Sequence, residues 1–141
     1  MMIGQLLANR SRDVVSVTSG TAVREVVALL AERRIGAVPV MDGGAVIGIM
    51  SERDIIYRLT SDGAVILDWP VEKVMTAPVV TVAPDSSVLG GLALMTRRRI
   101  RHLPVVEGTR MIGIVSIGDL VKARMDRIES EAEAMRQYIQ G

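Results

Sequence analysis

The sequence predicts a mixed α/β (α+β) fold, in which two β-α-β-β-α units pack pseudo-symmetrically into one globule and a long helix follows. The chief reason is an internal repeat in the 141 residues: "RRIGAVPV" at 33–40 returns as "RRIRHLPV" at 98–105, and "GIMSERD" at 48–54 returns as "GIVSIGD" at 113–119. The offset is 65 residues throughout, without a gap. In each copy, short β-branched runs flank an apolar pattern with helical spacing. With 49% apolar residues but only 2% aromatic ones, the core must be aliphatic.

The elements of the first copy follow from its pattern in chain order. The β-branched run at 14–17 predicts a strand, and Thr21 is the predicted N-cap of the helix after it. The core face of that helix is predicted from helical spacing: Val23, Val26, Val27 and Leu30. Two strands, 37–41 and 45–50, meet at "DGG", which is a hairpin signal. A closing helix starts near Ser51.

The second copy repeats this order. It predicts a strand at 79–82 and a helix capped by Ser86, with an apolar face made by Val88, Leu92 and Met95. Strands at 102–106 and 111–115 follow, and the last helix starts near Ser116. The sheet of one unit is too small to be stable alone, so we expect the two units to pack sheet against sheet.

The domain organisation follows from these elements. We expect an N-terminal arm at 1–9, the first repeat at 10–60, a linker at 61–74, the second repeat at 75–125 and a helical extension at 126–141.

Composition excludes several classes of function. A net charge of +1 gives no general attraction to nucleic acid or to anionic membranes. No cysteine and a single histidine exclude thiolate and multi-histidine metal sites. The apolar stretches are far shorter than the ~18 residues of a membrane span, and no nucleophile elbow is present. We therefore expect a cytoplasmic protein that is not an enzyme.

Both repeats carry Ser-x-x-Asp where a strand passes into a helix: Ser51 with Asp54, and Ser116 with Asp119. One interpretation is a capping box, in which each side chain accepts a hydrogen bond from the other residue's backbone N–H. The other is a ligand site, because a helix N-terminus attracts phosphate and an Asp carboxylate can accept hydrogen bonds from the hydroxyls of a ribose. The spacing alone leaves both open.

The arrangement "RRIRHLPVVEG…MIGIVSIGDLV", with its earlier copy "RRIGAVPVMDG…VIGIMSERDII", resembles the tandem cystathionine-β-synthase (CBS) domain pair over residues 10 to 125. This resemblance implies a non-catalytic regulatory module, usually dimeric. It also implies an adenosine-containing ligand such as AMP, ATP, NAD(H) or S-adenosylmethionine in the clefts between repeats, and no catalytic cofactor.

The resemblance also implies the site residues. Ser51 and Ser116 would contact phosphate or ribose, and Asp54 and Asp119 the ribose diol. One base pocket would be lined by Val14, Ile35, Ala37 and Pro39, and the other by Val79, Ile100, His102 and Pro104. The candidate nucleotide-binding set further includes Gly36, Arg53, Thr76 and Arg101. Arg53 can reach a phosphate, whereas its counterpart Gly118 cannot, so if both clefts are occupied we expect them to prefer differently charged or differently sized ligands.

Two further stretches have open interpretations. The basic run "TRRRIRH" at 96–102 either complements a helix C-terminus or captures phosphate. From Val121 to Ile139, apolar residues recur at alternating steps of four and three, which is a coiled-coil pattern. We favour a homodimer contact over a helix folded back on its own globule. The alternative function is a protein-interaction scaffold that works through this helix with empty clefts, and any regulated partner protein is unknown from the sequence.

Overall fold

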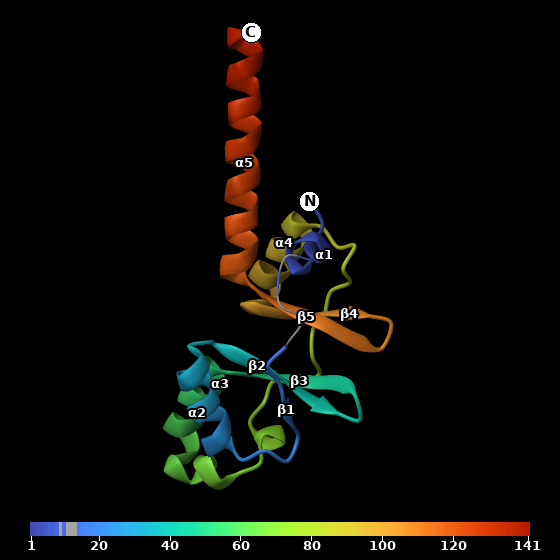
Figure 1. The fold of residues 1–141 in the computed structure, drawn as a ribbon. Coiled ribbons are helices and arrows are strands. Elements are labelled where there is room, and N and C mark those ends of the chain that lie inside the picture. Colours follow the sequence, from blue (N-terminus) through green and yellow to red (C-terminus); the bar gives the residue numbers. More distant parts are fainter. Residues whose placement is uncertain (9, 11–13) are drawn as a thin grey trace.

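The computed structural model describes residues 1–8, 10 and 14–141. Two similar units lie one above the other with their sheets between them, and a long helix leaves the second unit (Figure 1). The first unit contains β1 (Val17–Thr18), α2 (Val23–Arg33), β2 (Ala37–Asp42), β3 (Ala45–Ser51) and α3 (Glu52–Asp62). The second contains α4 (Val88–Arg98), β4 (His102–Glu107), β5 (Arg110–Ser116) and α5 (Ile117–Gln140). The predicted fold class is confirmed.

The two hairpins have the same register. β2 and β3 are antiparallel with Pro39 opposite Ile49, and β4 and β5 are antiparallel with Pro104 opposite Ile114. Each hairpin has an irregularity at the equivalent place, after Val40 in one and after Val105 in the other. The 65-residue repeat of the sequence is therefore a repeat of hydrogen-bond pattern.

The first strand of each unit is shorter than predicted. β1 covers only Val17–Thr18, paired in parallel with β2, and the segment predicted as a strand at 79–82 makes a single bridge between Val82 and Val105. The residues just before β1, Val14 and Val15, line a cleft between the two units. They have the β-branched character of a strand but face a cavity, which explains the misprediction.

Both predicted caps of the repeat helices are wrong by one residue. Helix α2 has Ala22 as its N-cap with no side-chain bond, because the Thr21 hydroxyl lies 3.1 Å from that of Thr18 instead. Helix α4 is capped by Ser87 rather than Ser86, and the Ser87 hydroxyl accepts from the Gly90 N–H at 2.9 Å.

The core consists of two aliphatic clusters, one for each unit. The predicted helix faces are in them, with Val23, Val26 and Leu30 buried in the first cluster, and Val88 and Met95 in the second.

The segment predicted as an N-terminal arm contributes to the second core. It forms the short helix α1 (Ile3–Leu7), which lies beside the second unit (Figure 1), and Ile3 is fully buried in the core of that unit. The linker plays the same part for the first unit. It contains the 3₁₀ turns η1 (Ala64–Asp68) and η2 (Val71–Lys73), and Val71 and Val74 are buried in the first core.

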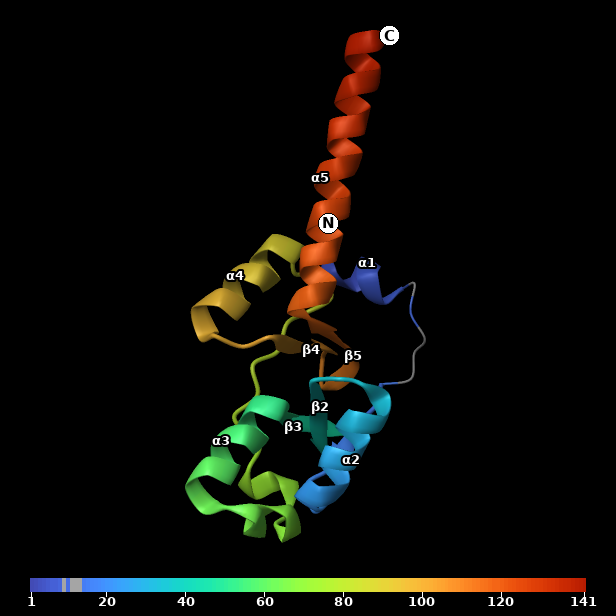
Figure 2. The ribbon, with the colours of Figure 1, turned by 90° about the vertical axis from the view of Figure 1, so that its left-hand side faces the viewer.

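Helix α5 extends well beyond the rest of the molecule in both views (Figures 1 and 2). Its buried residues are Leu120 and Ala123, both near its start. Among residues 1–8, 10 and 14–141, no helix combines the length and the apolar character that crossing a membrane requires.

Candidate functional site

The Ser-x-x-Asp motif forms a capping box in both units. At the start of α3, the Ser51 backbone N–H donates to Asp54 Oδ2 at 2.9 Å, and the Asp54 N–H donates to Ser51 Oγ at 3.2 Å. At the start of α5, the equivalent distances are 2.7 Å from Ser116 N to Asp119 Oδ2 and 3.1 Å from Asp119 N to Ser116 Oγ. The capping interpretation is therefore correct, but it uses only the Oδ2 atom of each carboxylate.

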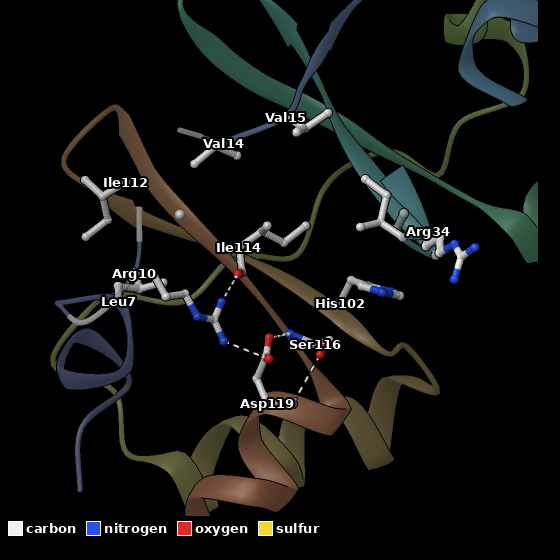
Figure 3. Close-up of a pocket in the computed structure, with 14 residues that line it drawn as sticks. Leu7, Arg10, Val14, Val15, Arg34, His102, Ile112, Ile114, Ser116 and Asp119 are labelled. Carbon is white, nitrogen blue, oxygen red and sulfur yellow. Dashed lines mark hydrogen bonds and ion pairs between the residues drawn. The ribbon is translucent and has the colours of Figure 1, made fainter. Parts of the chain in front are cut away.

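The other oxygen of each carboxylate has a different partner in the two units. Asp54 Oδ1 accepts from the Thr76 hydroxyl at 2.9 Å. Asp119 Oδ1 lies 2.7 Å from Nη2 of Arg10, which also donates through Nη1 to the Ile114 carbonyl at 3.1 Å (Figure 3). Neither Oδ1 contributes to the cap, so each is an acceptor that a ligand can use if the present partner moves or shares it.

The cleft above Asp119, which we call the Asp119 cleft, has a volume of about 500 Å³. Its walls come from both units: Ser116, Ile114 and Ile112 from the second unit face Val14, Val15, Ile35 and Ala37 from the first. Figure 3 shows the aliphatic side chains on opposite sides of the cavity, with Arg10 and Asp119 at its base and Arg34 and His102 at one end. Such a mainly apolar cavity with a few convergent polar groups is typical of a small-molecule site.

The second cleft, the Asp54 cleft, has a volume of about 350 Å³ and is more strongly charged. Ser51 and Asp54 of the first unit face Ile100 and His102 of the second. Its cationic side chains are Arg53, Arg99 and Arg101, and Glu52 and Tyr57 also line it. Both volumes fall within the roughly 300–1,000 Å³ range of small-molecule sites.

Most of the predicted site residues are brought together in these clefts. The Asp119 cleft contains Val14, Ile35, Gly36, Ala37, His102, Ser116 and Asp119. The Asp54 cleft contains Ser51, Arg53, Asp54, Thr76, Ile100 and Arg101, and it shares Gly36, Ala37 and His102 with the first. Each Ser-Asp pair therefore faces apolar residues of the other unit.

Three predicted residues do not line either cleft. Pro39 and Pro104 are buried at the centres of β2 and β4, and Val79 is half-buried in the segment before the second unit. Each proline lies two residues after a cleft-lining residue, Ala37 or His102, and so on the same face of its strand, but further along the strand than either cleft reaches.

Sequence reasoning missed Arg10, Arg34 and Tyr57, and it considered Arg99 only as part of the basic run at 96–102. Arg34 and Arg99 occupy equivalent positions, each as the C-cap residue of its helix with a positive φ of 53° and 56°. A non-glycine residue in this conformation is strained and is typical of functional positions. The sequence signal was present, because both arginines follow a predicted helix, but no pattern shows which residue of a basic run has a positive φ.

Arg10 had a weaker signal, because the repeated motifs at 33–54 and 98–119 do not include it. The basic run at 96–102 fits both of its interpretations in part. Arg97 and Arg98 lie in the last turn of α4, whereas Arg99 and Arg101 line the Asp54 cleft.

His102 lies between the two clefts. Burial lowers the pKa of its imidazole below 6.5, and the nearby carboxylates of Glu52 and Asp119 only partly oppose this effect. Gly36 makes room for the ring, because a Cβ on Gly36 would lie 3.3 Å from His102 Cε1. The ring is therefore mainly uncharged at neutral pH, and it lines both clefts.

The pKa of the Asp119 carboxyl is also lowered. Burial by itself acts in the opposite direction, but the hydrogen bonds from the Ser116 backbone and from Arg10, together with the Ser116 side chain, outweigh it. The carboxylate is therefore ionised and suited to accept hydrogen bonds.

A repeated α+β unit, with paired clefts at the helix N-termini between its copies, defines a two-fold module with two candidate ligand sites. Comparison with known proteins identifies the class further. The CBS domain family matches the chain twice, at residues 4–61 and 71–126, and the chain belongs to this family.

Curated relatives agree with this assignment. The chain is 33% identical over 123 residues to the CBS domain-containing protein YhcV of Bacillus subtilis, covering 87% of this chain and 86% of that protein. It is 36% identical over 129 residues to the mitochondrial CBS domain-containing protein CBSX3 of Arabidopsis thaliana. That match covers 88% of this chain but only 63% of the length of CBSX3.

Solved structures show the same fold. A protein with CBS domains from Burkholderia ambifaria superposes with a TM-score of 0.84 at 38% identity, covering 89% of this chain and 95% of that one. A CBS-domain containing protein from Agrobacterium tumefaciens gives a TM-score of 0.83 at 40% identity, covering 88% and 99%. The predicted tandem CBS pair is confirmed.

Proposed function

We propose that this chain is a non-catalytic sensor that binds adenosine-containing ligands, such as AMP, ATP, NAD(H) or S-adenosylmethionine, in its two inter-repeat clefts. The observation that carries the proposal is that the two oxygen atoms of each carboxylate have different partners. Oδ2 of Asp54 and of Asp119 holds the helix cap, and Oδ1 points to a partner at the edge of a cleft of nucleoside size. A carboxylate oxygen is the acceptor that a ribose diol needs.

The remaining groups of each cleft suit the other parts of such a ligand. In the Asp119 cleft, Ile35, Ala37 and Val14 offer an apolar wall for a purine, and Ile49 and Ile100 do so in the Asp54 cleft. The N-terminus of the adjoining helix, together with the Ser hydroxyl, favours a phosphate.

Proteins of this fold are known to hold such ligands. The solved structure of the CBS domain pair of protein MJ0100 is a complex with 5′-methylthioadenosine and S-adenosyl-L-methionine, and it resembles this chain with a TM-score of 0.79 at 24% identity. At that identity the likeness concerns the fold, so the ligand class of this chain rests on its own clefts.

The two clefts differ in their arginine side chains, since Arg10 and Arg34 line the Asp119 cleft and three arginines line the Asp54 cleft, and this supports different ligands. Arg53, Arg99 and Arg101 line the Asp54 cleft, which favours a polyphosphate such as ATP. In the Asp119 cleft Arg10 is already paired, and Gly118 stands where the first unit has Arg53. This cleft suits a less charged ligand, such as AMP or S-adenosylmethionine.

A sensor also needs two states, and a ligand shifts them only if it binds one state better. The clefts are suited to this, because each is lined by both units and a ligand would contact both. We further propose that the protein is a homodimer and that ligand binding changes its inter-repeat geometry or its dimer contact. The compartment stays a prediction of the sequence, the cytoplasm, and the regulated partner is unidentified.

The test is calorimetric titration of the full chain with AMP, ATP, NAD, NADH and S-adenosylmethionine. We expect at least one ligand to bind, and ATP to prefer the Asp54 cleft. Absence of binding by all five would refute the sensor and favour the second candidate, a scaffold that uses the exposed face of α5. Steady-state turnover of a bound nucleotide would refute the non-catalytic part of the proposal.

A further inference from the structure

Helix α5 carries an exposed apolar stripe that nothing in the described chain covers. The stripe consists of Val121, Met125, Ile128, Ala132, Met135 and Ile139. Met125, Met135 and Ile139 are 63%, 60% and 75% exposed. The last buried residue of the helix is Ala123, yet the helix continues to Gln140, away from both units (Figure 2).

An isolated helical segment of this length is only marginally stable in water. The intrahelical ion pairs Lys122–Asp126 at 2.7 Å and Arg127–Glu131 at 2.9 Å, both on exposed side chains, add only a little. The projecting part of α5 therefore needs a partner along its apolar stripe, whose alternating spacing is that of a coiled coil.

We propose that this partner is the α5 helix of a second copy of the chain, in a parallel and in-register coiled coil. This inference rests on the homodimer proposed above and specifies its contact. In heptad terms, Met125, Ala132 and Ile139 occupy a positions, and Val121, Ile128 and Met135 occupy d positions. The charged residues that flank this seam then decide the direction of the partner helix.

A parallel pair brings opposite charges together. In this arrangement a residue at g contacts the partner residue five positions further along, at e. Arg124 then meets the partner's Glu129, and two-fold symmetry makes this contact twice. Glu131 meets the partner's Arg136 in the same way. Within the residues that the structure describes, Arg124 and Glu129 have no ion-pair partner, so both are available.

An antiparallel pair brings like charges together. When the same apolar residues face each other, with each a position opposite a partner d position, the midpoint falls at Ser130. Glu129 then faces the partner's Glu129, and Glu131 faces the partner's Glu131. Lys122 faces the partner's Arg136. The charge pattern therefore favours the parallel arrangement, which places both pairs of repeats at the same end of the coiled coil.

A single-cysteine experiment tests the direction, because the natural chain has no cysteine. In the parallel pair, Ile139 lies next to its own counterpart, within the roughly 7 Å between Cα atoms that a disulfide allows. In the antiparallel pair, the two copies of Ile139 are roughly 27 Å apart at 1.5 Å per residue. We expect Ile139→Cys to form a covalent dimer under mild oxidation, and the outward-facing control Gln137→Cys not to do so.

Charge exchange gives a second and independent test on the full chain. Arg124→Glu and Glu129→Arg should each raise the dimer dissociation constant about 2- to 30-fold, and the double variant should restore it. Glu129→Arg also serves as a control for misfolding, because Glu129 lies in the part of α5 beyond the second core, where a substitution should not disturb the fold.

Each outcome is distinct. A monomeric wild-type protein in light scattering overturns the homodimer itself. A dimer in which Ile139→Cys does not cross-link, or in which charge exchange has no effect, overturns the parallel coiled coil alone. Neither result depends on nucleotide binding.

Discussion

Replacing Asp54 separates its capping role from its proposed ligand role, because each role uses a different oxygen atom. In Asp54→Asn, the amide oxygen can still accept from the Ser51 N–H, and the amide nitrogen can donate to the Thr76 hydroxyl in place of the present bond. In Asp54→Ala, both interactions are lost. The two variants therefore remove the proposed diol acceptor alike but differ in what they do to the helix.

The structure sets the size of each effect. Asp54→Asn loses only the charge near the helix N-terminus, about 0.3–1 kcal/mol, whereas Asp54→Ala also loses the cap, about 0.5–2 kcal/mol. A hydrogen bond to a charged group contributes about 1.5–3 kcal/mol. Loss of the ionised acceptor should therefore weaken nucleotide binding in this cleft by about 10- to 150-fold in both variants.

Urea denaturation and calorimetric titration, carried out on the same samples, measure the two effects. We expect Asp54→Asn to keep most of its free energy of unfolding and to lose affinity as strongly as Asp54→Ala. The matched variant Asp119→Asn should affect the other cleft. Unchanged affinity in Asp54→Ala, despite its lower stability, would show that Asp54 only caps the helix and would refute the reasoning.

Three further predictions concern other positions. Gly48→Ala should destabilise the fold by about 1–3 kcal/mol, because the new Cβ would lie 3.0 Å from the Thr76 carbonyl oxygen. Gly113→Ala should destabilise it less, because the new Cβ would meet the end of the flexible Leu7 side chain. Equal losses of unfolding free energy in urea denaturation would contradict this. Arg99→Gly should relieve the strain of the positive φ of 56° and raise the free energy of unfolding by about 1 kcal/mol. In titrations it should lower the affinity for ATP more than the affinity for adenosine. An equal loss of both affinities would show that Arg99 does not bind the phosphates. The half-buried His102 binds its proton less readily when the chain is folded, so the free energy of unfolding should fall as the pH drops below 6.5. His102→Ala should show a smaller decrease in the free energy of unfolding between pH 7.5 and 5.5, and an unchanged slope would contradict the assignment.

The repeat made much of this fold predictable from the sequence. Hairpins and helix faces depend on local periodicity and on turn residues such as Gly43, which has a φ of 57°, so they could be read directly. Cap positions depend on competition between neighbouring hydroxyls, and here Thr21 bonds to Thr18 instead of the helix. Periodicity cannot show the outcome of such a competition.

Most residues that line the two candidate clefts were named from the sequence, but the way in which they face one another was not. The motif fixes where Ser51 and Asp54 lie, but Ile100 and His102, which they face across the cleft, belong to the other unit. Residues of the two units face each other because the two sheets pack together, and such a long-range contact cannot be predicted from local sequence patterns. Arg10 escaped prediction for a related reason, since its contact with Asp119 joins residues more than a hundred positions apart.

The difference between the two clefts originates in the segment that precedes each unit. Against β3, the backbone of Thr76 exchanges two hydrogen bonds with Ile49, and its hydroxyl reaches Asp54. Against β5, the equivalent carbonyl of Ile114 receives the guanidinium of Arg10 instead, and the same side chain reaches Asp119. A neutral hydroxyl can share its acceptor with a ribose, whereas a ligand diol at Asp119 must compete with an ion pair. Because both carboxylates cap their helices in the same way, we expect this choice of partner, rather than the repeated motif, to decide how readily each cleft accepts the proposed ligand.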